Sequence, residues 1–172
     1  MNHKLKKIHI LGGSGAGKTY LSKKLSKELN IKKYDLDNIV WSKKSKYYDI
    51  QVPITEKHNE LNKILQNNSW IIDGVYYDWV FESFKKADLI ILLKPSVFLR
   101  DFRVIKRFVL KKLGLYKTGK KERLKDLISL LKWNHYYEKV RITETLKCVK
   151  PFKTKTIFFN SADEAFENII KN

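Results

Sequence analysis

The sequence predicts an α/β fold of three layers, in which a parallel sheet is covered by helices on both faces. Two observations lead to this prediction. Short apolar segments alternate with segments of helical periodicity along the chain, and a glycine-rich loop at residues 12–19 joins the first apolar segment to the first helical one. In such folds, ligands bind at the carboxyl ends of the strands.

The elements follow one another in order. We expect strands at residues 6–11, 33–36, 70–72, 88–93 and 156–159, which makes a sheet of about five strands. Helices are expected over residues 18–29, 55–66, 81–86, 95–114 and 124–148, with a last helix opening at Ser161. The helix at 95–114 carries Phe98, Phe102, Ile105 and Val109 on one side.

The chain has 172 residues and 20.4 kDa, enough for a single domain over residues 1–172. Residues 36–66 and 107–125 interrupt the alternation, so both are candidates for insertions that cover substrate. The content of 43% hydrophobic residues favours a packed core over disorder. No apolar run approaches the roughly 20 residues that cross a bilayer, so we expect no membrane partner. Cys148 is the only cysteine, which excludes an internal disulfide and suggests the cytoplasm.

The charge balance favours anionic partners. There are 36 basic and 18 acidic residues, which gives a formal net charge of +18. Only five of the basic residues are arginine, a bias typical of AT-rich coding sequences, so weak and salt-sensitive nucleic-acid binding is the expectation. A nucleic-acid-binding NTPase stays open as an alternative function.

The glycine-rich loop matches G-x-x-x-x-G-K-[ST] at every fixed position. Its backbone N–H groups and the helix that follows would hold the phosphates of ATP. Lys18 would reach the β- and γ-phosphates, and the Thr19 hydroxyl would bind Mg²⁺. A dinucleotide fingerprint is absent from this loop, which argues against NAD and FAD. The predicted nucleotide-binding residues are Gly12, Gly13, Ser14, Gly15, Ala16, Gly17, Lys18 and Thr19.

Carboxylates follow two of the predicted strands. Asp35 and Asp37 are two residues apart, so on a strand both would point into the same cleft. One would support Mg²⁺ and the other would orient or deprotonate an acceptor hydroxyl. Asp73 follows another strand and is a further candidate for Mg²⁺. In each case a plain turn aspartate is the alternative.

Arginines cluster on one predicted helix. Arg100, Arg103 and Arg107 are spaced by three and four residues, which predicts one helix face. Arginine in a lysine-rich chain favours bidentate phosphate contacts, with a solvated basic face as the alternative.

These motifs, with the segments Tyr-Asp-Leu-Asp, Trp-Ile-Ile-Asp-Gly and Leu-Leu-Lys-Trp-Asn-His, resemble the bacterial topology modulation proteins, which are similar to adenylate and shikimate kinases. The resemblance implies a P-loop NTPase fold with a five-stranded core, a substrate-binding insertion at 36–66 and a lid at 107–125. It implies that Lys18, Arg103 and Arg107 stabilise the transferred phosphoryl group. Asp35 and Asp37 match the Asp-x-Asp of shikimate-type kinases, and Asp73-Gly74 resembles the Asp-Gly of adenylate kinases.

The leading prediction is therefore a kinase that transfers the γ-phosphoryl group of Mg-ATP to a small molecule or nucleotide held near Asp37. The alternative is a nucleic-acid-binding NTPase that affects DNA topology. A GTPase is disfavoured because Asn62-Lys63 lacks the aspartate of a guanine motif. The aromatic run at residues 133–137 is a plain helix face, a wall of the acceptor site or a homodimer contact.

Overall fold

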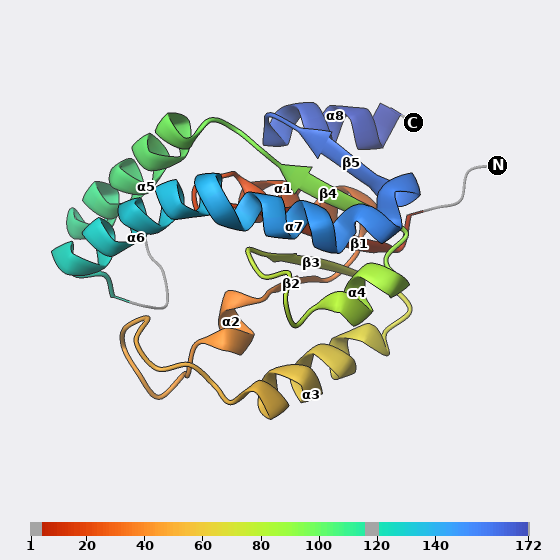
Figure 1. The fold of residues 1–172 in the computed structure, drawn as a ribbon, viewed down its shortest axis with the longest axis horizontal. Helices are drawn as coiled ribbons and strands as arrows, with labels where there is room; N and C mark the ends of the chain where they lie inside the picture. Colours follow the sequence, from red (N-terminus) through yellow and green to blue (C-terminus); the bar gives the residue numbers. More distant parts are fainter. Residues whose placement is uncertain (1–4, 116–120, 172) are drawn as a thin grey trace.

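The sheet has five parallel strands, as expected. A computed structural model describes residues 5–115 and 121–171. The strand order is β2-β3-β1-β4-β5 (Figure 1). The strands are β1 (Lys7–Gly12), β2 (Lys33–Asp35), β3 (Trp70–Gly74), β4 (Leu89–Leu93) and β5 (Thr156–Phe159).

Helical segments connect these strands. They are α1 (Lys18–Leu29), α2 (Asp37–Val40), α3 (Ile54–Leu65), α4 (Phe81–Lys86), α5 (Val97–Lys112), α6 (Leu124–Tyr136), the π-helix η1 (Tyr137–Arg141), α7 (Ile142–Val149), the 3₁₀ helix η2 (Lys150–Lys155) and α8 (Ala162–Lys171). Within the described ranges, no helix is long and apolar enough to cross a membrane.

Two cores lie on opposite faces of the sheet and make the three layers. Ile8 and Ile10 of β1 pack with Leu21 and Leu25 of α1 and with α8. On the other face, Leu11 packs among residues of α3, α4 and α7. Successive residues of a strand point to opposite faces, so one apolar strand supplies both cores.

The register places the carboxyl ends of the central strands side by side. Leu11 lies beside Gly74 of β3, and Gly12 lies beside Leu93 of β4. On the outer strand β2, Asp35 is the partner of Asp73. The phosphate loop and the predicted acidic residues therefore meet at one edge of the sheet.

One helix differs from expectation. The helix predicted over 124–148 is divided, because residues 137–141 form a π-helical turn that separates α6 from α7. Helix α5 exposes the side that carries Phe98, which is 78% exposed, and buries the side that carries Arg100, which is 1% exposed. Helical periodicity shows that a helix has two faces, and the arginine side is buried here because it lies against the phosphate loop.

The two predicted insertions have different structures. Residues 36–66 contain α2, a loop closed by an isolated bridge between Trp41 and Gln51, and α3. The predicted lid at 107–125 begins inside α5 and continues into the start of α6. Its residues 116–120 lie outside the described part of the chain.

Candidate functional site

The phosphate loop runs between β1 and α1, where the sequence placed it. Lys18 Nζ donates a hydrogen bond of 2.9 Å to the Gly13 carbonyl oxygen. Gly15 has a φ of +78°, and a Cβ there would lie 2.5 Å from the Arg100 carbonyl oxygen. The first turn of α5 therefore presses on the loop so closely that only glycine fits at this position.

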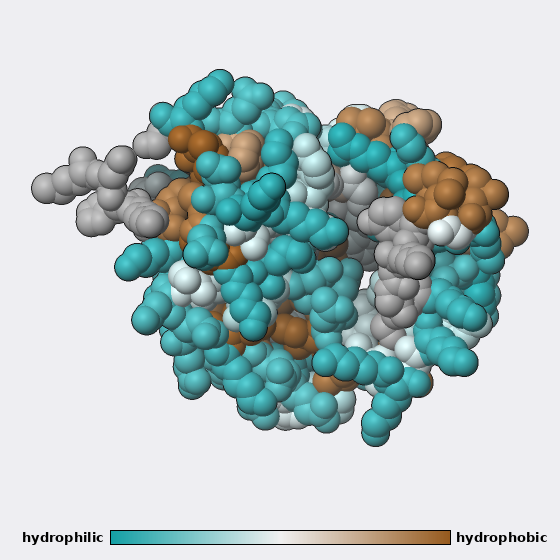
Figure 2. Space-filling view, turned by 180° about the vertical axis from the view of Figure 1, so that it is seen from behind, coloured by the Kyte–Doolittle hydropathy of each residue, from teal (hydrophilic) through white to brown (hydrophobic). Residues whose placement is uncertain are grey.

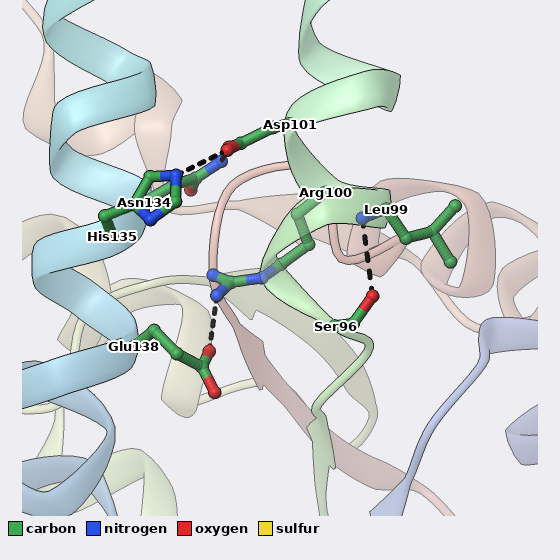
Figure 3. A network of polar contacts seen from close by, with 7 residues as sticks. All are labelled: Ser96, Leu99, Arg100, Asp101, Asn134, His135 and Glu138. Atoms are coloured by element: carbon green, nitrogen blue, oxygen red, sulfur yellow. Dashed lines mark hydrogen bonds and ion pairs between the residues drawn. The ribbon is translucent and has the colours of Figure 1, made fainter.

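Arg100 fills the space beside Gly13. A Cβ on Gly13 would lie 1.9 Å from Arg100 Nη1. Arg100 Nη2 donates a hydrogen bond of 2.5 Å to Glu138 Oε2, as Figure 3 shows, and the guanidinium lies 5.4 Å from the centre of the Tyr137 ring. Its Nε and Nη1 atoms have no hydrogen-bond partner among the described residues. Arg100 thus joins the phosphate loop to the π-helix η1.

The three arginines lie along one side of α5, and Arg100 and Arg103 both contact the phosphate loop. Arg103 Nη1 donates a hydrogen bond of 3.3 Å to the Gly15 carbonyl oxygen, on the phosphate loop. Arg107 Nη2 lies 3.6 Å from Glu122 Oε1. Arg100 is also paired with the carboxylate of Glu138 at the α5–η1 interface.

Thr19 and Asp73 form the part of the site suited to a cation. Thr19 Oγ1 donates a hydrogen bond of 3.0 Å to Asp73 Oδ2. Asp73 is 1% exposed, and its other oxygen, Oδ1, has no partner within the described chain. Burial raises the pKa of this carboxyl, with Lys18 and Thr19 opposing the shift. A hydroxyl and a free carboxylate oxygen beside a phosphate loop are ligands that fit Mg²⁺.

No cluster of three or more His, Cys, Asp and Glu side chains in the described ranges would hold a metal ion by itself. Mg²⁺ in nucleotide sites is bound through one or two carboxylates together with substrate phosphates. The pair of Thr19 and Asp73 therefore matches a Mg-nucleotide better than a resident metal.

Asp35 and Asp37 lie in the same cleft, but not as neighbours on one strand. β2 ends at Asp35, and Asp37 is the first residue of α2. Asp35 Oδ1 accepts a hydrogen bond of 2.9 Å from the Asp37 backbone N–H, so the chain turns between them. Burial, with the charges of Asp73 and Asp37, raises the pKa of Asp35 to about 6.

A cavity of about 220 Å³ opens beside these carboxylates. One wall is aromatic, since Trp41 and Tyr48 meet edge to face with 5.8 Å between ring centres. The lining residues are Asp35, Asp37, Asn38, Trp41, Lys43, Ser45 and Tyr48, all from the first predicted insertion or its edge. Sequence reasoning missed the aromatic ones, because residues of an irregular loop follow no period that would mark them.

Charges converge on Lys18 from this cleft. Burial lowers the pKa of the Lys18 ammonium, the charges of Asp37, Asp73 and Asp35 raise it, and Arg107 lowers it. Lys18 and these acidic residues thus influence one another across a single site. The structure brings together the phosphate loop, the three predicted aspartates and Arg103.

The predicted lid and insertion touch at the rim of the site. The Lys121 backbone N–H donates a hydrogen bond of 2.8 Å to the Lys46 carbonyl oxygen. The Arg123 guanidinium lies 4.2 Å from the centre of the Tyr47 ring. Residues at the two ends of the site are therefore in contact in this structure.

A phosphate loop at the end of the central strand of a parallel five-stranded sheet defines a P-loop protein. The sequence profile described as AAA domain matches residues 8–107, more than half of the chain. The chain belongs to this AAA domain family.

One curated relative is the "Uncharacterized protein YqaC" of Bacillus subtilis (strain 168), with 36% identity over 89 residues. The match covers 51% of this chain and 48% of that protein, so the chain spans about half the length of this relative.

Two solved structures share the fold. A shikimate kinase from Acinetobacter baumannii, in complex with shikimate, superposes with a TM-score of 0.55 at 18% identity, covering 97% of this chain and 92% of that one. A gluconokinase from Sinorhizobium meliloti 1021 gives a TM-score of 0.57 at 13% identity, covering 94% and 87%. These likenesses confirm the predicted fold class. They do not identify the acceptor of this protein.

Proposed function

We propose that this protein is an ATP-dependent phosphotransferase that moves the γ-phosphoryl group of Mg-ATP to a small-molecule or nucleotide acceptor. The observation that carries the proposal is a single cleft in which the phosphate loop lies next to an acidic cavity lined by Asp37. A kinase needs a phosphate-binding loop and an acceptor cavity side by side, because the acceptor attacks the γ-phosphorus in line with the leaving ADP.

The residues of the cleft have complementary roles in this proposal. Lys18 and the N–H groups of residues 12–19 bind the phosphates, and Arg103 and Arg107 neutralise charge on the group in transfer. Mg²⁺, held by Thr19 and Asp73 with support from Asp35, would screen the phosphate oxygens when bound.

Asp37 is the acceptor-side base. An acceptor hydroxyl oxygen attacks the γ-phosphorus, the bond from that phosphorus to the bridging oxygen breaks, and ADP leaves with the electron pair. Asp37 accepts the proton of the hydroxyl. If the acceptor is a phosphate, Asp37 instead orients it. The cavity lining carries two carboxylates and Lys43 as its charged groups, which favours a hydroxyl-bearing acceptor over a strongly anionic one.

A metabolite screen tests the proposal. The wild-type protein is incubated with ATP, Mg²⁺ and pools of small molecules, and new phosphorylated species are detected by mass spectrometry. We expect one acceptor class to be phosphorylated, and Asp37→Asn to lose that transfer while it keeps its ATP affinity. Asp78→Asn, an exposed aspartate outside the cavity, is the matched control. Equal transfer by Asp37→Asn would contradict the role of Asp37.

A nucleic-acid-dependent NTPase is the second candidate, favoured by the net charge of +18. It predicts DNA binding that survives near-physiological salt and DNA-stimulated ATP hydrolysis that Asp37→Asn leaves unchanged. The kinase proposal predicts weak DNA binding that falls steeply with salt and does not respond to ATP.

A further inference from the structure

Helix α5 has an inner side that combines arginines with apolar residues, and a second apolar side that is exposed. Arg100, Val104 and Phe108 are its buried residues, and Arg103 contacts the phosphate loop. A surface helix normally has one apolar stripe, which faces the core, and a polar side toward solvent. The inner side contacts the phosphate loop through Arg103 and packs on Leu127 of α6, and neither contact explains why the outer side is also apolar.

The outer side forms a continuous stripe, here called the apolar ridge. Its spacing of four, three, four and four residues keeps every member on one side of the helix over four turns. Figure 2 shows this hydrophobic strip along α5, at the upper right of the view. The ridge consists of Phe98 (78% exposed), Phe102 (62%), Ile105 (43%), Val109 (47%) and Leu113 (66%).

The charges around the apolar ridge select an anionic partner. α5 carries one acidic residue, Asp101, which is engaged by Asn134 Nδ2 and His135 Nε2 at 2.8 Å each (Figure 3). Lys106 and Lys112 are exposed on the same side of the helix as the ridge. A second copy of the chain would bring these lysines and two charges of +18 together, so self-association is disfavoured.

Figure 1 shows α5 at the outer edge of the molecule, away from the sheet. Exposed phenylalanine and leucine flanked by lysine are typical of helices that lie in the interface of an anionic bilayer. We propose that the apolar ridge of α5 binds an anionic lipid surface, with Phe98 and Phe102 entering the interface and Lys106 and Lys112 contacting the headgroups.

This inference revises the expectation that the protein has no membrane partner. That expectation came from the lack of an apolar run long enough to span a bilayer, which a helix lying on the surface does not need. The proposed lipid binding does not depend on the proposed kinase activity, because vesicle binding is measured without ATP or acceptor.

Vesicle co-sedimentation tests the proposal. The protein is mixed with vesicles of phosphatidylcholine alone or with phosphatidylglycerol, at low and near-physiological salt. We expect binding to the anionic vesicles, and at least about a tenfold loss of affinity in the double variant Phe98→Ser, Phe102→Ser. Phe158→Ser, which changes a 52% exposed phenylalanine on β5, is the matched control. Thermal melting shows that each variant is folded.

Binding of the double variant equal to that of the wild type would overturn the proposal, since charge alone would then explain it. No binding by the wild type would also overturn it. A second readout uses Phe102→Cys in a Cys148→Ser background, labelled with an environment-sensitive fluorophore, for which we expect a blue shift with anionic vesicles. A wild-type dimer in ultracentrifugation that the double variant abolishes, without vesicle binding, would assign the ridge to a second copy instead.

Discussion

Tyr76 Oη donates a hydrogen bond of 2.7 Å to Asp37 Oδ1. The two residues are 39 positions apart and come from different strand ends, β3 for Tyr76 and β2 for Asp37. Burial, with the charge of Asp37, raises the pKa of Tyr76, so the phenol stays protonated and keeps donating. This bond fixes one oxygen of Asp37, and in the proposed kinase the other oxygen would face the acceptor.

Tyr76→Phe should reduce turnover of the acceptor by about tenfold or more, because hydrogen bonds to charged groups contribute about 1.5–3 kcal/mol. ATP affinity should not change. Tyr20→Phe is the matched control, since Tyr20 Oη donates a hydrogen bond of 2.9 Å to Asp163 Oδ1 on the surface, outside the cavity. Turnover by Tyr76→Phe equal to that of Tyr20→Phe would show that the bond does not serve the reaction.

Gly13→Ala should destabilise the protein by about 1–3 kcal/mol, because its Cβ would overlap the guanidinium of Arg100. The backbone of Gly13 is outside the left-handed region, so the clash is the reason for glycine here. In an Arg100→Ala background, the same change should cost much less. Urea unfolding of the four proteins in this cycle measures the coupling, and additive effects would contradict the contact.

His9 should make the protein less stable in acid. It is fully buried on β1, with Nδ1 2.7 Å from Ser83 Oγ, and burial lowers its pKa from 6.5 to about 3. The unfolded chain therefore binds a proton below pH 6.5 that the folded chain refuses. The contribution of neutral His9 to the free energy of unfolding is fully present above pH 6.5. It falls between pH 6.5 and pH 3, by up to about 1.4 kcal/mol per pH unit.

Unfolding in urea at pH 7 and pH 5 measures this loss. His9→Phe cannot titrate, so its free energy of unfolding should fall less between the two pH values than that of the wild type. Asp35 and Asp73 have raised pKa values, which favour the folded state in acid. Both residues are present in the two proteins, so their contributions cancel in the comparison. An equal loss in both proteins would contradict the assignment to His9.

The fold was predictable from local sequence patterns, whereas the arrangement of the site depends on contacts between residues that are far apart in the sequence. The alternation of strands and helices and the loop at residues 12–19 depend on neighbours in sequence, so both were predictable. The bond between Tyr76 and Asp37, and the contact between Arg100 and Gly13, join residues that no local period relates. The sequence likewise does not indicate which side of α5 faces inward, because hydrophobicity alone does not mark a face that lies on a phosphate site.

Arg103→Ala should lower turnover by on the order of 10³-fold and change ATP affinity much less, because its charge acts on the group in transfer. The Arg103 side chain lies 3.3 Å from the Gly15 carbonyl oxygen of the phosphate loop. Arg141→Ala is the control, since Arg141 of η1 pairs with Asp78, between β3 and α4, and with Glu144 of α7. Small and similar effects on affinity and turnover would place Arg103 on a solvated basic face.

The central claim is that the loop at residues 12–19 binds ATP for phosphoryl transfer, and calorimetry of Mg-ATP binding to Lys18→Ala tests it most directly. The control is Lys23→Ala, an exposed lysine on the same helix α1. We predict that the wild type and Lys23→Ala bind Mg-ATP, and that Lys18→Ala loses binding while its melting temperature stays close to that of the wild type. Unchanged Mg-ATP affinity in a folded Lys18→Ala protein would contradict the account.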